Sequence, residues 1–101
     1  MSVRSFGSII RELRAEKGLL LREVTAALGI DPAIVSKFEK GERKPNREQV
    51  LAFEKLYDTQ PDELLIAWLS DKVASHLEDE DVALKALQVA EEKIRCRKTD
   101  S

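Results

Sequence analysis

The 101 residues suffice for one domain, and the scarcity of Gly (4), Pro (3) and aromatic residues (5%) beside abundant Leu, Ala, Glu and Lys favours helices. A single cysteine, Cys96, excludes an intramolecular disulfide and a thiolate metal site, and no apolar run is long enough to cross a bilayer. The net charge of −2 is unevenly distributed, because the first 48 residues carry ten Lys and Arg against seven Asp and Glu, and the remaining 53 carry seven against twelve.

We therefore expect a cytoplasmic protein without a membrane partner. The basic first half and acidic second half suit a nucleic-acid-binding region joined to another element, or else two ordinary solvated faces.

Gly and Pro residues divide the chain into short segments with the periodicity of amphipathic helices. The first predicted helix runs from about Phe6 to Lys17, after Ser5 as a cap. The second runs from Leu21 to Leu28 and ends at Gly29.

Two further helices have clear start signals. Asp31 followed by Pro32 begins a helix that ends at Gly41. Asn46, with Gln49 three residues later, forms a variant of the capping box and begins the fourth helix.

The last two predicted helices are longer. The fifth begins at Pro61, and the sixth runs from about Asp79 to Arg95. Acids at residues 78–81 and basic residues at the far end of the sixth helix match the helix dipole. No segment has a convincing strand pattern, so the predicted fold class is all-α.

Residues 21–43 contain two short helices joined by a three-residue turn that begins at Gly29. They read LREVTAALGIDPAIVSKFEKGER. The apolar positions pack the two helices at a steep angle and leave one face of the second helix free; they are Val24, Leu28, Ile30, Val35 and Phe38. Such a helix fits the major groove of B-DNA, which is about 12 Å wide.

This segment resembles the helix-turn-helix of the phage-repressor-like family, also called the XRE or Cro/C1 family. The features that recur in order are Arg14, Gly29, the run from Ser36 through Glu39 to Gly41, Lys44–Pro45 and Pro61–Leu65. The resemblance covers Phe6 to Leu69, about two-thirds of the chain. It implies a five-helix repressor-like DNA-binding domain with an additional C-terminal helix.

We expect the chain to divide into three regions. Residues 1–61 would form the core DNA-binding region with its motif at 21–41. Residues 62–95 would complete the core and form a dimer interface, and residues 96–101 would be a flexible tail.

By the same resemblance, residues 32–40 form the recognition helix. The positions that match base-facing positions of the family are Pro32, Ala33, Ser36 and Lys37. Lys37 is the best suited of these to a base contact, because a lysine can donate to O6 and N7 of guanine.

A second set of side chains is expected to hold backbone phosphates, since cations and helix N-termini bind them. This set is Arg22, Lys40, Arg43, Lys44, Asn46 and Arg47. Arg14 and Glu39 match family positions that form an ion pair, which would orient the recognition helix. Two residues depart from the family: Leu21 stands where Gln is frequent, and Thr25 where a small residue is usual.

The C-terminal third is expected to form a homodimer, since one helix-turn-helix reads few base pairs. Helices that are apolar on more than one side need more than one partner surface. The expected interface residues are Ile66, Trp68, Leu69, Val73, Val82, Ala86 and Val89. The alternative is that all of this surface packs inside the monomer.

The expected function is sequence-specific binding of double-stranded DNA, at a palindromic operator, by a homodimeric transcriptional regulator. A repressor or autoregulator such as a restriction–modification controller fits this description. The alternative is an antitoxin or protein-interaction module with the same fold, whose acidic second half binds a protein partner. His76 and Cys96 have no second catalytic partner and no glycine-rich phosphate loop is present, so neither an enzyme, a cofactor nor a metal is expected.

Overall fold

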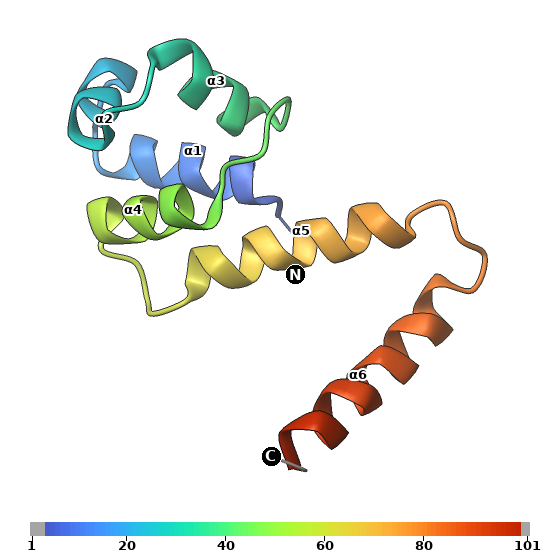
Figure 1. The fold of residues 1–101 in the computed structure, drawn as a ribbon. Coiled ribbons are helices and arrows are strands. Elements are labelled where there is room, and N and C mark those ends of the chain that lie inside the picture. Colours follow the sequence, from blue (N-terminus) through green and yellow to red (C-terminus); the bar gives the residue numbers. More distant parts are fainter. Residues whose placement is uncertain (1–3, 100–101) are drawn as a thin grey trace. The chain divides into compact units, whose positions relative to one another are not determined.

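The computed structural model describes residues 4–99, which form helices and no strands (Figure 1). The helices are α1 (Phe6–Glu16), α2 (Leu21–Leu28), α3 (Pro32–Lys40), α4 (Arg47–Tyr57), α5 (Glu63–Leu77) and α6 (Ala83–Thr99). The expected all-α class is confirmed. The chain divides into two compact units, Met1–Asp71 and Lys72–Ser101, which are described separately.

The first four helices begin where the sequence predicted. The Ser5 hydroxyl caps α1, and an Asp31 carboxylate oxygen accepts from the Ala33 backbone N–H at 2.8 Å to cap α3. The capping box of α4 is complete, because the side chains of Asn46 and Gln49 accept from each other's backbone N–H at 2.8 and 2.9 Å. Local side-chain hydrogen bonds thus fix these helix starts.

The two later helices begin further along than predicted. Asp62 has a φ of 65°, a left-handed conformation that does not belong to an α-helix, so α5 begins at Glu63 and not at Pro61. Before α6, the Glu80 N–H donates to the Leu77 carbonyl and the Ala83 N–H to the Glu80 carbonyl. These are four-residue turns, and the acids at 78–81 lie in them and not in the helix.

The end of α6 also differs from the prediction. The helix continues past Arg95 to Thr99, so the flexible tail predicted from residue 96 is wrong for residues 96–99. Residues 100 and 101 lie outside the described residues. No helix within residues 4–99 combines the length and apolar character needed to cross a bilayer.

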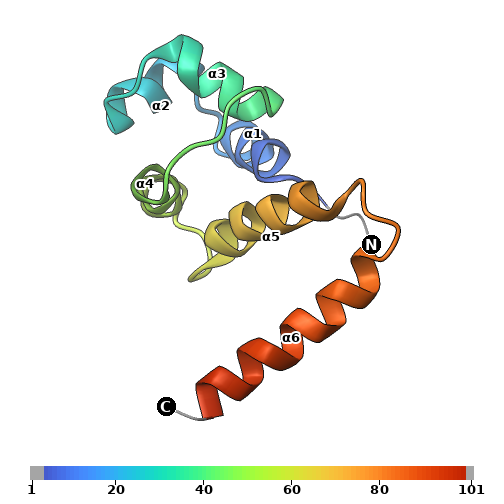
Figure 2. The ribbon, with the colours of Figure 1, turned by 45° about the vertical axis from the view of Figure 1, so that its right-hand side comes forward.

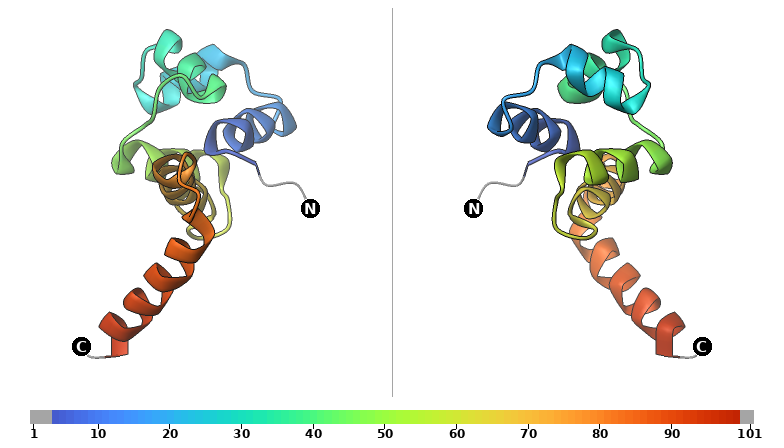
Figure 3. Two further views of the ribbon diagram at one scale, coloured as in Figure 1. Left: turned by 90° about the vertical axis from the view of Figure 1, so that its right-hand side faces the viewer. Right: turned by 90° about the vertical axis from the view of Figure 1, so that its left-hand side faces the viewer.

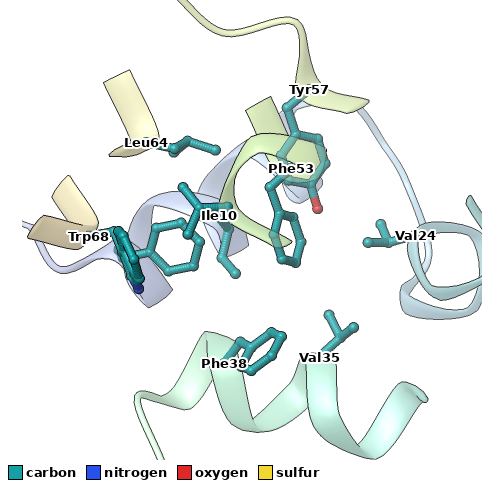
Figure 4. Packing of buried hydrophobic residues seen from close by; sticks show 10 residues of the cluster. Ile10, Val24, Val35, Phe38, Phe53, Tyr57, Leu64 and Trp68 are labelled. Carbon is teal, nitrogen blue, oxygen red and sulfur yellow. The ribbon is translucent and has the colours of Figure 1, made fainter. Parts of the chain in front are cut away.

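The core of the first unit is centred on Phe53 of α4 (Figure 4). Its ring packs edge-on against Phe6 and Phe38, with centroids 5.9 and 6.3 Å apart, and stacks on Tyr57 at 5.9 Å. The other buried apolar side chains come from α1 to α5; they are Ile10, Val24, Val35, Val50, Leu64 and Trp68. This core joins α1, α3 and α4 through aromatic contacts that each contribute about 1 kcal/mol beyond burial.

Helix α1 lies between α3 and the first part of α5 (Figures 1, 2 and 3). Its approach to α3 is close at Gly7, where an added Cβ would lie 2.4 Å from the Phe38 carbonyl oxygen and 2.9 Å from that of Glu39. Any larger side chain would displace the α3 backbone, so Gly7 sets the depth at which α3 packs.

The second unit contains the end of α5, the connecting turns and α6. None of the described α6 side chains is buried. Within this unit a largely apolar groove of about 520 Å³ is lined by Val73, His76, Leu77 and Lys72 of α5 and by Ala86, Leu87 and Ala90 of α6.

Candidate nucleic-acid interface

Helix α3 has one buried side and one uncovered side. Val35 and Phe38 project from it towards the core (Figure 4). On the opposite side, given 100° per residue, lie Ala33, Ser36 and Lys37, while Pro32 lies at the flank between the two sides. Pro32, Ala33 and Lys37 are exposed and Ser36 is half-buried.

The structure brings Arg14 of α1 and Glu39 of α3 together. Arg14 Nε and Nη2 donate to the two Glu39 carboxylate oxygens at 2.7 and 3.0 Å, and Nη1 donates to the Leu19 carbonyl at 3.3 Å. The Glu39 side chain is only 7% exposed. These hydrogen bonds to Glu39 raise the pKa of Arg14, and the planar fork fixes the last turn of α3 against α1.

Tyr57 lies beside this ion pair. Its hydroxyl is buried and has no hydrogen-bond partner among residues 4–99. Burial, with a smaller contribution from the Glu39 charge, raises the pKa of Tyr57 to about 12, while the Arg14 charge opposes the shift. The side chain therefore stays neutral and packs against Phe53.

The loop after α3 is held in place from α5. The Trp68 indole Nε1 donates to the Pro45 carbonyl oxygen at 2.9 Å, and Pro45 is buried. Trp68 was expected in the dimer interface, and this expectation is wrong: the side chain is 6% exposed and belongs to the core. Its hydrogen bond instead positions the loop that carries Lys44 and Asn46.

The six predicted phosphate-binding residues are all exposed; they are Arg22, Lys40, Arg43, Lys44, Asn46 and Arg47. Within residues 4–99, none of the five cations among them forms an ion pair with a carboxylate. Five of the six lie at the end of α3, in the following loop and at the start of α4, whereas Arg22 lies on α2.

Two of these side chains have second roles. The Arg47 guanidinium carbon lies 5.8 Å from the centre of the Trp68 ring. The Asn46 side-chain oxygen caps α4, which leaves the amide N–H groups to donate to a ligand.

The two departures from the family pattern are accommodated. Thr25 is buried, and its hydroxyl donates to the Arg22 carbonyl at 3.0 Å, so the additional polar atom is satisfied within α2. Leu21 is half-buried at the start of α2 and offers no polar group there.

Sequence reasoning missed two carboxylates that act over long separations. A Glu54 oxygen accepts from the Leu64 and Leu65 N–H groups at 3.0 and 3.1 Å and caps α5. An Asp71 oxygen accepts from the Phe6 N–H at 2.8 Å and caps α1. No local motif marks either residue, because the partners are 10 to 65 positions away.

No group of His, Cys, Asp and Glu side chains within the described part of the chain is arranged to hold a metal ion.

A helix-turn-helix family model matches residues 10–64, a span that runs from the middle of α1 to the start of α5 and contains α2 and α3 entirely. Neither the curated proteins nor the solved structures provide a significant match.

Proposed function

The chain belongs to the XRE/Cro-C1-type helix-turn-helix family of DNA-binding transcription regulators, and we propose that it reads a specific double-stranded DNA sequence by placing α3 in the major groove. The observation that carries this proposal is the uncovered side of α3, opposite Val35 and Phe38. The Arg14–Glu39 pair and the close approach at Gly7 hold that side in a fixed orientation.

Within this proposal, Lys37 makes the main base contact. Its exposed ammonium suits the paired acceptors O6 and N7 of guanine, and the Ala33 methyl suits the methyl group of thymine. Ser36 donates or accepts beside them, and Pro32 contributes packing only.

The exposed cations around the loop after α3 contact backbone phosphates. The loop is anchored by the Trp68–Pro45 hydrogen bond, so Lys44 and Arg43 are presented from a fixed backbone. Such contacts position the protein on the duplex and make its affinity depend on salt.

We further propose that two copies associate through the second unit. Its exposed apolar side chains include Val82, Leu84, Leu87, Val89 and Ile94, and Leu84 is 78% exposed. Of the interface residues expected from sequence, Val73, Val82, Ala86 and Val89 are exposed in this unit, and Ile66 and Leu69 are exposed in the first. Leu84, Leu87 and Val89 lie on more than one side of α6, and a helix that is apolar on more than one side needs a partner surface.

The distribution of charge along α6 favours a second copy of this chain as the partner of the exposed apolar surface. Acids at 78–81 precede α6, and Arg97 and Lys98 lie in its last turn, whereas Arg95 pairs with Glu91 of the same helix at 2.7 Å. Two α6 helices related antiparallel by a two-fold axis would place the acids of one copy near the cations of the other. A two-fold interface requires such self-complementarity.

Bound over a promoter, the dimer would act as a repressor or autoregulator by excluding the polymerase from the same DNA. A restriction–modification controller would act in this way. An antitoxin role is the second candidate, because the apolar surface of α6 and its acidic turn would also suit a partner protein.

The experiment that tests DNA reading is selection of bound duplexes from a random pool. We expect the selected duplexes to share a palindrome with half-sites about 10 base pairs apart. Recovery of unrelated sequences would contradict the proposal, and a single unrepeated half-site would contradict the dimer.

A further inference from the structure

A small pocket lies where α1, the start of α2 and α3 meet. It has a volume of about 200 Å³ and is lined by Arg11, Arg14, Leu21, Ser36, Glu39 and Lys40. Sites for drug-sized molecules typically span 300–1,000 Å³, so this pocket suits a smaller group.

The charges in the pocket favour an anion. Arg14 and Glu39 neutralise each other in their bidentate pair. The cations that remain are Arg11 and Lys40, both exposed and neither in an ion pair with a carboxylate within residues 4–99. The pocket therefore has a net positive charge, with the Ser36 hydroxyl as a neutral donor.

The pocket adjoins the side of α3 that the proposed function places in the groove. Ser36 and Lys40 are one helical turn apart on that side. Arg11, which belongs to α1, lines the same pocket. With α3 in the major groove, the DNA strand at the edge of that groove would pass over the pocket and present its phosphates to it.

We propose that this pocket binds one phosphodiester of the DNA backbone and that Arg11 is its principal cation, assisted by Lys40 and Ser36. The site compensates for Leu21, which supplies no hydrogen bond at the start of α2. This inference rests on the proposed function, and it adds a DNA contact on α1, outside the recognition helix and the loop after it.

The test uses the full chain and DNA obtained from the selection described above. Arg11→Gln should lower the slope of log affinity against log salt by about 0.9, the value for one phosphate contact. Its base preference in a second selection should match that of the unchanged protein, because the contact reads no base. Lys55→Gln is the matched control, since it removes one exposed cation from α4 and should leave the slope unchanged.

Methylphosphonate scanning supplies a second readout. Neutralising one particular phosphate should weaken DNA binding by the unchanged protein, and should weaken binding by Arg11→Gln much less, because only Lys40 and Ser36 still contact that phosphate. If the unchanged protein binds its selected DNA and Arg11→Gln keeps both the full slope and undiminished sensitivity to every methylphosphonate, this inference is overturned and the proposed function stands. If the unchanged protein selects no DNA sequence, the proposed function itself fails.

Free phosphate is the other source of the same chemistry. Inorganic phosphate should leave the Arg11 Nε–H resonance of the DNA-free protein unchanged at millimolar concentration, compared with chloride at equal ionic strength. A saturable shift would assign the pocket to a free anion and overturn the assignment to DNA.

Discussion

The Arg14 guanidinium holds both carboxylate oxygens of Glu39, at 2.7 and 3.0 Å, and so joins α1 to the last turn of α3. Because Glu39 is nearly buried, removing only its partner leaves a charge without compensation. Arg14→Ala should therefore lower the free energy of unfolding by about 3 kcal/mol, measured by urea denaturation.

A double substitution separates the stability of this pair from its orienting role. Arg14→Met with Glu39→Leu should recover most of the lost stability, because apolar side chains can replace a buried pair at little cost. DNA affinity should remain reduced, since the fork that orients α3 is gone. Full recovery of both quantities would show that the pair does not orient the helix.

Because the pKa of Tyr57 is raised in the fold, we expect the free energy of unfolding to depend on pH in the alkaline range. The pKa is raised from 10.0 in the unfolded chain to about 12 in the fold. Between these values the unfolded chain loses the phenol proton and the native state keeps it, so stability is intact below pH 10 and falls as pH rises. The slope should approach about 1.4 kcal/mol per pH unit.

Tyr57→Phe is the matched control for this titration. The buried hydroxyl has no partner among residues 4–99, so its removal should leave stability at pH 7 unchanged or slightly higher. Denaturation curves from pH 9 to 12 should show a smaller loss in the variant than in the unchanged protein. Parallel losses in the two proteins would exclude Tyr57 as the titrating group.

Lys44 tests the phosphate set. Lys44→Ala should weaken binding to all duplexes similarly and reduce the salt slope by about 0.9, because one released counterion is lost. Fluorescence anisotropy over a salt series measures both quantities. A change of preference among DNA sequences, with the slope unaltered, would make Lys44 a base-reading residue instead.

Leu87 tests the interface between copies. Leu87→Glu places a charge in the apolar groove of the second unit and should convert the dimer to a monomer, with weaker operator binding. Leu51→Glu is the control, because Leu51 on α4 has the same 44% exposure but lies outside the proposed interface. Sedimentation at micromolar concentration measures the masses, and a dimer in both variants would place the interface elsewhere.

The features that sequence predicted well are those with local causes. Asp31 before Pro32, and Asn46 with Gln49, fix the starts of α3 and α4 through hydrogen bonds that span two or three residues. Helical periodicity likewise placed Val35 on the buried side of α3.

The features that sequence missed have distant causes. Trp68 has the apolar character of an interface residue, and only the fold shows that its N–H reaches the Pro45 carbonyl, 23 positions away. Glu54 and Asp71 look like ordinary surface acids until the fold brings helix N-termini to them. The start of α6 was misplaced because acids favour both a first helical turn and the loop before it.

Selection of DNA by Lys37→Ala, beside the unchanged protein, tests the reading role of α3 most directly. We predict that base preference is relaxed at one position of each half-site, with a loss of about 1–3 kcal/mol for the original base and little change at the other positions. An equal loss of affinity for every sequence, with preference intact at all positions, would contradict it.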